Sequence, residues 1–124
     1  MFTFARRVAW IAGVALPIGE TWRRWGALWV QPVAYVDDLV MGALFLVGAV
    51  MAGRGARGAR WLAAAYGCAL GVMSLSLVAG IGSMSQPDPS GVSGVTALMV
   101  KVAMTALVIA GLTGAIIGDA PEPR

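Results

Sequence analysis

The chain has 124 residues, of which 59% are hydrophobic and only 12% are charged. Soluble domains average about 45–50% apolar and about 25% charged residues, so this composition argues against a soluble protein and predicts a single membrane domain over 1–124. The net charge of +3 does not indicate nucleic-acid binding, because the arginines interrupt apolar runs and do not cover a solvated face.

The residue types that most catalytic and metal sites require are scarce. The chain has no histidine, and its one cysteine, Cys68, lies in an apolar run without a neighbouring base. The sequence therefore predicts no catalytic residues, no metal site and no cofactor, and the protein is not expected to be an enzyme.

The first predicted helix covers 2–22. Its uncharged part, Val8 to Gly19, is short and contains Pro17. Because Arg6 and Arg7 can extend their charged ends to the interface, the segment is still about long enough to cross a bilayer. Removal as a signal peptide is not favoured, since no small-x-small cleavage site follows. A first helix that lies in the interface, leaving three spans, is the alternative.

An elbow at the outer membrane surface is predicted over 20–31. Trp22, Trp25 and Trp29 recur at i, i+3 and i+7, so a helix would present them on one face. Indole rings favour the headgroup region, and an interfacial aromatic belt is the preferred interpretation. A stacking platform for a sugar or a quaternary amine is the alternative.

Three further apolar runs are long enough to cross about 30 Å of hydrocarbon, at 33–53, 61–82 and 92–118. A basic cytoplasmic loop at 54–60 and an outer loop at 83–91 separate them, and a tail follows at 119–124. The expected fold is therefore an all-α integral membrane protein, a four-helix transmembrane bundle.

The arginines predict the orientation of this bundle. One side carries Arg6, Arg7, Arg54, Arg57, Arg60 and Arg124. The other side carries only Arg23 and Arg24, so the excess of positive charge places both termini in the cytoplasm. The Ala- and Gly-rich composition and the preference for arginine over lysine are typical of GC-rich bacterial genomes, and the expected location is a bacterial inner membrane.

Small residues at four-residue spacing predict where helices pack. Gly67 and Gly71 form one G-x-x-x-G motif, and Gly114 and Gly118 form another. Such motifs let helix backbones approach closely inside a bilayer. The neighbour could be a helix of the same chain or a second copy of the chain, and these alternatives stay open.

Three charged residues lie inside the three apolar runs at 33–53, 61–82 and 92–118: Asp37, Asp38 and Lys101. A lone charge at depth costs about 2.5–3.5 kcal/mol even on insertion scales, so Lys101 needs a partner. Asp38 is the preferred one, because Tyr35 and Gly42 share its face. Together with Glu20, Arg23 and Arg24 the three residues make a balanced group of three acids and three bases.

That balance favours a structural network that ties the second predicted helix to the fourth and to the elbow. The leading hypothesis is therefore a structural or accessory-subunit role, with the lipid bilayer and a membrane partner as its contacts. An oligomeric transporter or channel for protons or cations is the alternative, with the same charges as its path. The hydroxyls of Ser74, Ser76, Thr105 and Thr113 are expected to bond to carbonyls of their own helices and not to line a path.

Overall fold

The described residues form four α-helices, α1 (Phe2–Arg23), α2 (Pro32–Ala52), α3 (Ala56–Gly82) and α4 (Gly94–Ile117). This computed structural model describes residues 1–23, 25–26, 32–86 and 93–118. The predicted all-α architecture with four helices is confirmed.

Three of the helices are long and apolar enough to cross a membrane, over Tyr35–Ala52, Ala56–Gly82 and Gly94–Ile117. With 22 residues, α1 is of similar length but includes Arg6, Arg7 and Glu20, which lower its hydropathy. That α1 also crosses the membrane stays a prediction.

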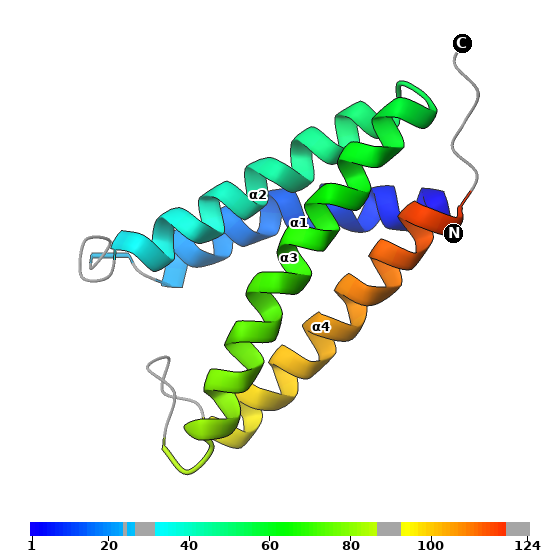
Figure 1. The fold of residues 1–124 in the computed structure, drawn as a ribbon. Coiled ribbons are helices and arrows are strands. Elements are labelled where there is room, and N and C mark those ends of the chain that lie inside the picture. The colour runs from blue at the N-terminus through cyan, green and yellow to red at the C-terminus, as the bar shows by residue number, and fades with distance from the viewer. Residues whose placement is uncertain (24, 27–31, 87–92, 119–124) are drawn as a thin grey trace.

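The helices pack as two hairpins. α1 lies beside α2, and α3 lies beside α4 (Figure 1). The hairpins meet where the N-terminus, the α2–α3 turn and the end of α4 come together, and they diverge toward the opposite ends (Figure 1). We call the end where they meet the arginine end, because Arg6, Arg7, Arg54, Arg57 and Arg60 belong to it.

The segment 54–60, predicted to be a loop, is mostly helical, because α3 begins at Ala56 and not at Trp61. Alanine and arginine are strong helix formers, so the basic run continues the apolar helix. The chain reverses at Gly55, whose φ of 96° is a conformation that favours glycine.

The interfacial elbow predicted over 20–31 is described only in part. α1 ends at Arg23, the N–H of Trp25 donates to the carbonyl of Trp22 at 3.2 Å, and Gly26 has a φ of 88°. A helix that carried all three tryptophans on one face is therefore interrupted at Gly26. Trp29 and the rest of 27–31 lie outside the described residues.

The largest fully buried side chains are Tyr66 and Leu62. The Tyr66 ring meets Phe45 edge to face at a centroid distance of 5.0 Å, and its hydroxyl donates to the carbonyl of Ala5 at 2.7 Å. The ring covers Gly111 of α4 so closely that a Cβ there would overlap it. One tyrosine thus joins all four helices near the arginine end.

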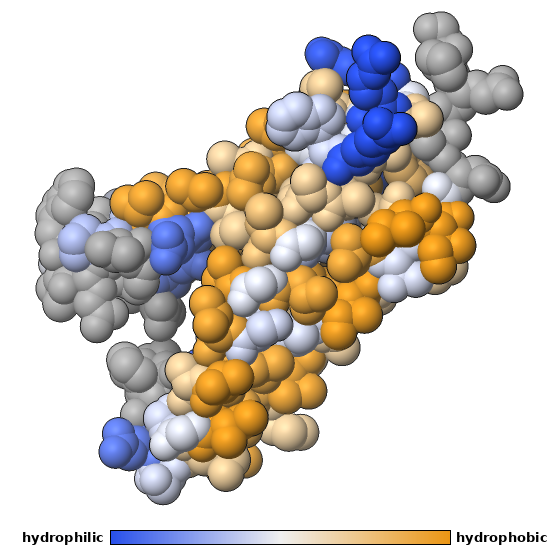
Figure 2. Space-filling model, viewed as in Figure 1, coloured by the Kyte–Doolittle hydropathy of each residue, from blue (hydrophilic) through white to orange (hydrophobic). Residues whose placement is uncertain are grey.

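Outside this core the surface is strongly apolar. Figure 2 shows hydrophobic residues over most of the visible faces of α3 and α4, with a hydrophilic group beside the α2–α3 turn. The share of residues buried in the three candidate spans is 33% for Tyr35–Ala52, 22% for Ala56–Gly82 and 17% for Gly94–Ile117. The helices therefore leave most of their own apolar length uncovered.

Candidate functional site

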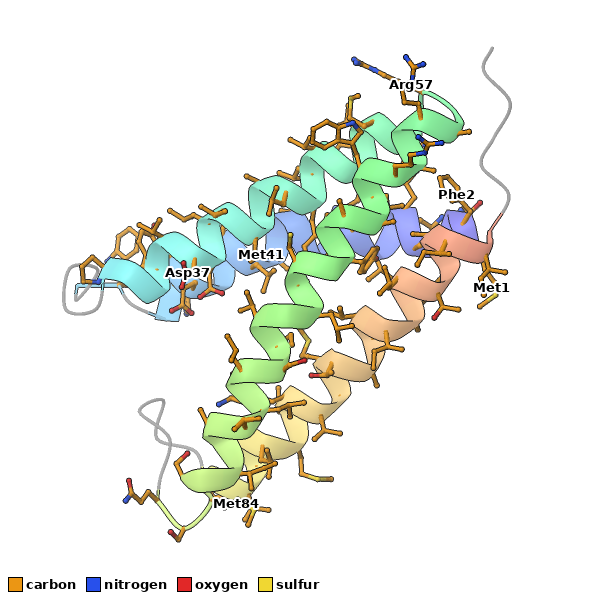
Figure 3. The ribbon with its side chains drawn as sticks, in the orientation of Figure 1. Met1, Phe2, Asp37, Met41, Arg57 and Met84 are labelled. Carbon is orange, nitrogen blue, oxygen red and sulfur yellow. The ribbon has the colours of Figure 1, made fainter. Side chains whose placement is uncertain are left out.

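The two aspartates lie near the start of α2, at the end where the hairpins diverge. Asp37 is exposed and Asp38 is half-buried. Figure 3 shows Asp37 close to the end of the α1–α2 hairpin. Since adjacent residues on a helix point about 100° apart, the two carboxylates face different surroundings.

Asp38 is the charged residue among those that line a cavity at the centre of the molecule. All four helices contribute to the wall, with Leu16 from α1, Phe45 from α2, Met73 from α3 and Met104 from α4. The volume of the cavity is about 50 Å³. A water molecule occupies about 30 Å³ in the liquid, whereas pockets for drug-sized ligands measure about 300–1,000 Å³. The cavity therefore has room for water beside a carboxylate but not for an organic substrate.

Lys101 belongs to the other hairpin. Its Nζ donates to the carbonyl of Ser76 on α3 at a long 3.5 Å, and its side chain lies against Gly80. Because α2 and α4 diverge toward this end, the described polar contact of the lysine is with α3 (Figure 1). The expected ion pair between Lys101 and Asp38 stays a prediction.

Tyr35, predicted to share a helix face with Asp38, connects α1 and α2. Its hydroxyl lies 3.0 Å from Oγ1 of Thr21, which donates to the carbonyl of Pro17 at 2.7 Å. A threonine hydroxyl has one hydrogen to donate, so Tyr35 donates to Thr21. Pro17 lies inside α1, and its ring packs where Gly42 has no side chain.

The other members of the predicted charge cluster are placed only in part. Glu20 is half-buried in the last turns of α1, at the same end of the hairpin as the aspartates. Arg23 is the last residue of α1, and Arg24 lies outside the described residues. The charge balance proposed for this group therefore stays a prediction.

The two predicted packing motifs have different surroundings. Gly114 is buried, with the carbonyl of Met1 2.9 Å from the position of an added Cβ, and Gly118 lies against Phe2. Gly67 and Gly71 are exposed, and an added Cβ would meet nothing within 4 Å. One motif therefore packs α4 against the start of α1, and the other faces outward from α3.

The remaining predicted features lie on the surface or within single helices. Trp22 and Trp25 are 81% and 79% exposed, as an interfacial position would require. The predicted back-bonding is confirmed for Ser74, Thr105 and Thr113, whose hydroxyls donate to the carbonyls four residues earlier.

Two polar contacts that sequence reasoning missed hold the arginine end together. Nε of Arg6 donates to the carbonyl of Ala49 at 2.9 Å, and its guanidinium covers Gly53. The second is the bond from Tyr66 to Ala5 described above. An arginine and a tyrosine near small residues were the available signals, but the partner of Arg6 lies 43 positions away in the chain and that of Tyr66 lies 61 positions away.

Within the described part of the chain, no group of three or more His, Cys, Asp or Glu residues could hold a metal ion. The arrangement offers one half-buried carboxylate, Asp38, on the wall of a cavity between the four helices, and an outward face of small residues on α3. No protein-family description, curated protein or solved structure matches the chain.

Proposed function

We propose that the chain is a small multi-pass membrane protein with a structural or accessory-subunit role, and that both termini face the cytoplasm of a bacterial cell. The observation that carries the proposal is the small buried share of the three apolar helices, at most 33% of a span. Apolar area of this extent is stable against lipid or a neighbouring subunit, whereas in water it would drive aggregation.

The outward face of α3 is the surface proposed for lateral packing. Gly67, Cys68 and Gly71 are exposed on this helix, and the two glycines leave open space. A helix of a second subunit could approach the α3 backbone closely there, and close packing is the main attraction between helices in lipid. The size of the central cavity supports a structural role as well, because it leaves no room for a substrate.

Membrane embedding is tested by alkaline carbonate extraction of cell membranes. The expected result is that the chain stays with the membrane pellet, and release into the supernatant would reject the embedding. Fusion of a reporter to each terminus then measures the orientation, with cytoplasmic activity expected at both ends.

Lateral packing is tested by cross-linking through Cys68 in intact membranes. We expect one discrete product, either a dimer or an adduct with one other membrane protein, which Gly71→Leu abolishes. Gly82→Leu is the matched control, since Gly82 is also an α3 glycine with open space around it and lies far from Cys68 along the helix. If the wild-type chain gives no product, or if both variants lose it equally, the subunit role is rejected.

A second candidate function is a path for protons through the same bundle, which the position of Asp38 beside the central cavity favours. The experiment is reconstitution into vesicles that enclose a pH-sensitive dye. Proton flux should disappear with Asp38→Asn and persist with Asp37→Asn, because Asp37 is exposed outside the cavity. Absence of proton flux through the wild-type chain would reject the proton path, and the structural role would then be the one remaining proposal.

A further inference from the structure

The arginine end of the bundle concentrates positive charge. Arg54, Arg57 and Arg60 are exposed around the α2–α3 turn, where Figure 2 shows a hydrophilic group and Figure 3 labels Arg57. Arg7 is exposed on the neighbouring helix α1. The acids of the described residues, Glu20, Asp37 and Asp38, lie near the opposite end of the α1–α2 hairpin.

The charges of the remaining tail do not cancel this excess. The sequence after Gly118 contains Asp119, Glu122 and Arg124, so the arginines at this end still outnumber the acids. The end of the bundle is therefore a surface that attracts anions.

A groove opens on this surface between the start of α3 and the end of α4. Its volume is about 420 Å³, and the residues that line it are Ala56, Ala59, Arg60 and Ala63 of α3 and residues 115–118. The alanine side chains are too short to fill the space between the helices, which leaves the groove open. Because these side chains are apolar, the floor of the groove is apolar as well. Arg60 supplies the positive charge beside that floor.

The arginines at this end do not all have the same role. Arg6 is held by the carbonyl of Ala49, and Arg54 donates to Sδ of Met51 at 3.6 Å. Arg60 lines the groove, while Arg7 is exposed on α1 and is not among the groove residues. Replacing Arg60 removes one positive charge at the groove, and replacing Arg7 removes one outside it. Comparing the two variants therefore distinguishes binding at the groove from general attraction by the positive charge of this end.

We infer that this groove binds an anionic phospholipid, with Arg60 at the headgroup phosphate and an acyl chain along the alanine floor. A guanidinium binds phosphate oxygens through two parallel hydrogen bonds, and basic pockets between helices on the cytoplasmic side suit anionic headgroups. The combination of one cation with an apolar channel matches an amphiphile. A free inorganic phosphate would gain nothing from the apolar floor.

The inference rests on the membrane embedding proposed above, but its test is separate. The purified full chain in detergent micelles is titrated with phosphatidylglycerol, and bound lipid is counted by native mass spectrometry. We expect one tightly bound lipid on the wild-type chain, an affinity at least fivefold weaker for Arg60→Gln, and an unchanged affinity for Arg7→Gln. Phosphatidylcholine should bind at least fivefold more weakly, and millimolar inorganic phosphate should not displace the lipid.

Three results would overturn the inference. Equal losses for Arg60→Gln and Arg7→Gln would indicate diffuse charge attraction, and equal binding of phosphatidylcholine would indicate an apolar groove without headgroup recognition. Displacement by inorganic phosphate would indicate a phosphate site that takes no lipid. The membrane embedding is tested separately, because only release of the chain by alkaline carbonate would reject it. None of the three lipid-binding results above bears on the embedding.

Discussion

Replacement of Tyr66 by phenylalanine or alanine tests the central packing of the bundle. Tyr66→Phe removes one hydrogen bond of 2.7 Å to the carbonyl of Ala5. That carbonyl keeps its α-helical partner, the N–H four residues later, so no buried acceptor is left unpaired. Hydrogen bonds between membrane helices contribute about 0.6 kcal/mol on average and about 1.7 kcal/mol at most, and the expected loss lies in that range.

Tyr66→Ala should cost more, because the ring contacts Phe45 at 5.0 Å and covers Gly111. If the cavity retains roughly 100 Å³, at about 24 cal/mol per Å³ the loss is about 2.4 kcal/mol. With the hydrogen bond added, the expected total is about 3–4 kcal/mol. The additional transfer of the ring from water is small if the unfolded helices remain in lipid.

The assay is the free energy of unfolding in mixed micelles, from titration with sodium dodecyl sulfate followed by circular dichroism. Trp10→Phe is a suitable control, since Trp10 is 42% exposed on α1. Should Tyr66→Ala cost no more than Tyr66→Phe, the ring would not be a packing centre. A loss above about 3 kcal/mol for Tyr66→Phe would contradict the argument that Ala5 keeps a partner.

Further predictions use the same assay. Gly42→Leu should destabilise the chain by about 1–3 kcal/mol because its side chain would overlap the Pro17 ring, whereas Gly19→Leu should be neutral because open space surrounds it. The predicted ion pair is tested by combining Asp38→Asn with Lys101→Met: a coupling larger than about 0.5 kcal/mol would establish the pair, and additive effects would reject it in favour of the contact of the lysine with Ser76 on α3. Ser93→Ala should cost about 1 kcal/mol, because the Ser93 side chain caps α4, and no change would show that the cap is not required.

The sequence determined the number of helices and most of their extents. In an apolar run of about 20 residues, helix formation satisfies every backbone polar group within the run itself, so the information is local. The same holds for Ser74, Thr105 and Thr113, which bond within their own helices as predicted. One boundary differs at 54–60, where helix propensity overrode the loop expected from the arginines.

Only the tertiary structure decided which faces meet. The sequence contains two G-x-x-x-G motifs, yet Gly114 packs against α1 while Gly67 faces outward. Likewise, nothing local shows that Tyr66 reaches Ala5 or that Lys101 lies against Ser76. These contacts depend on where helices far apart in the sequence cross, and a crossing depends on the shapes of both surfaces together, so neither helix determines it alone.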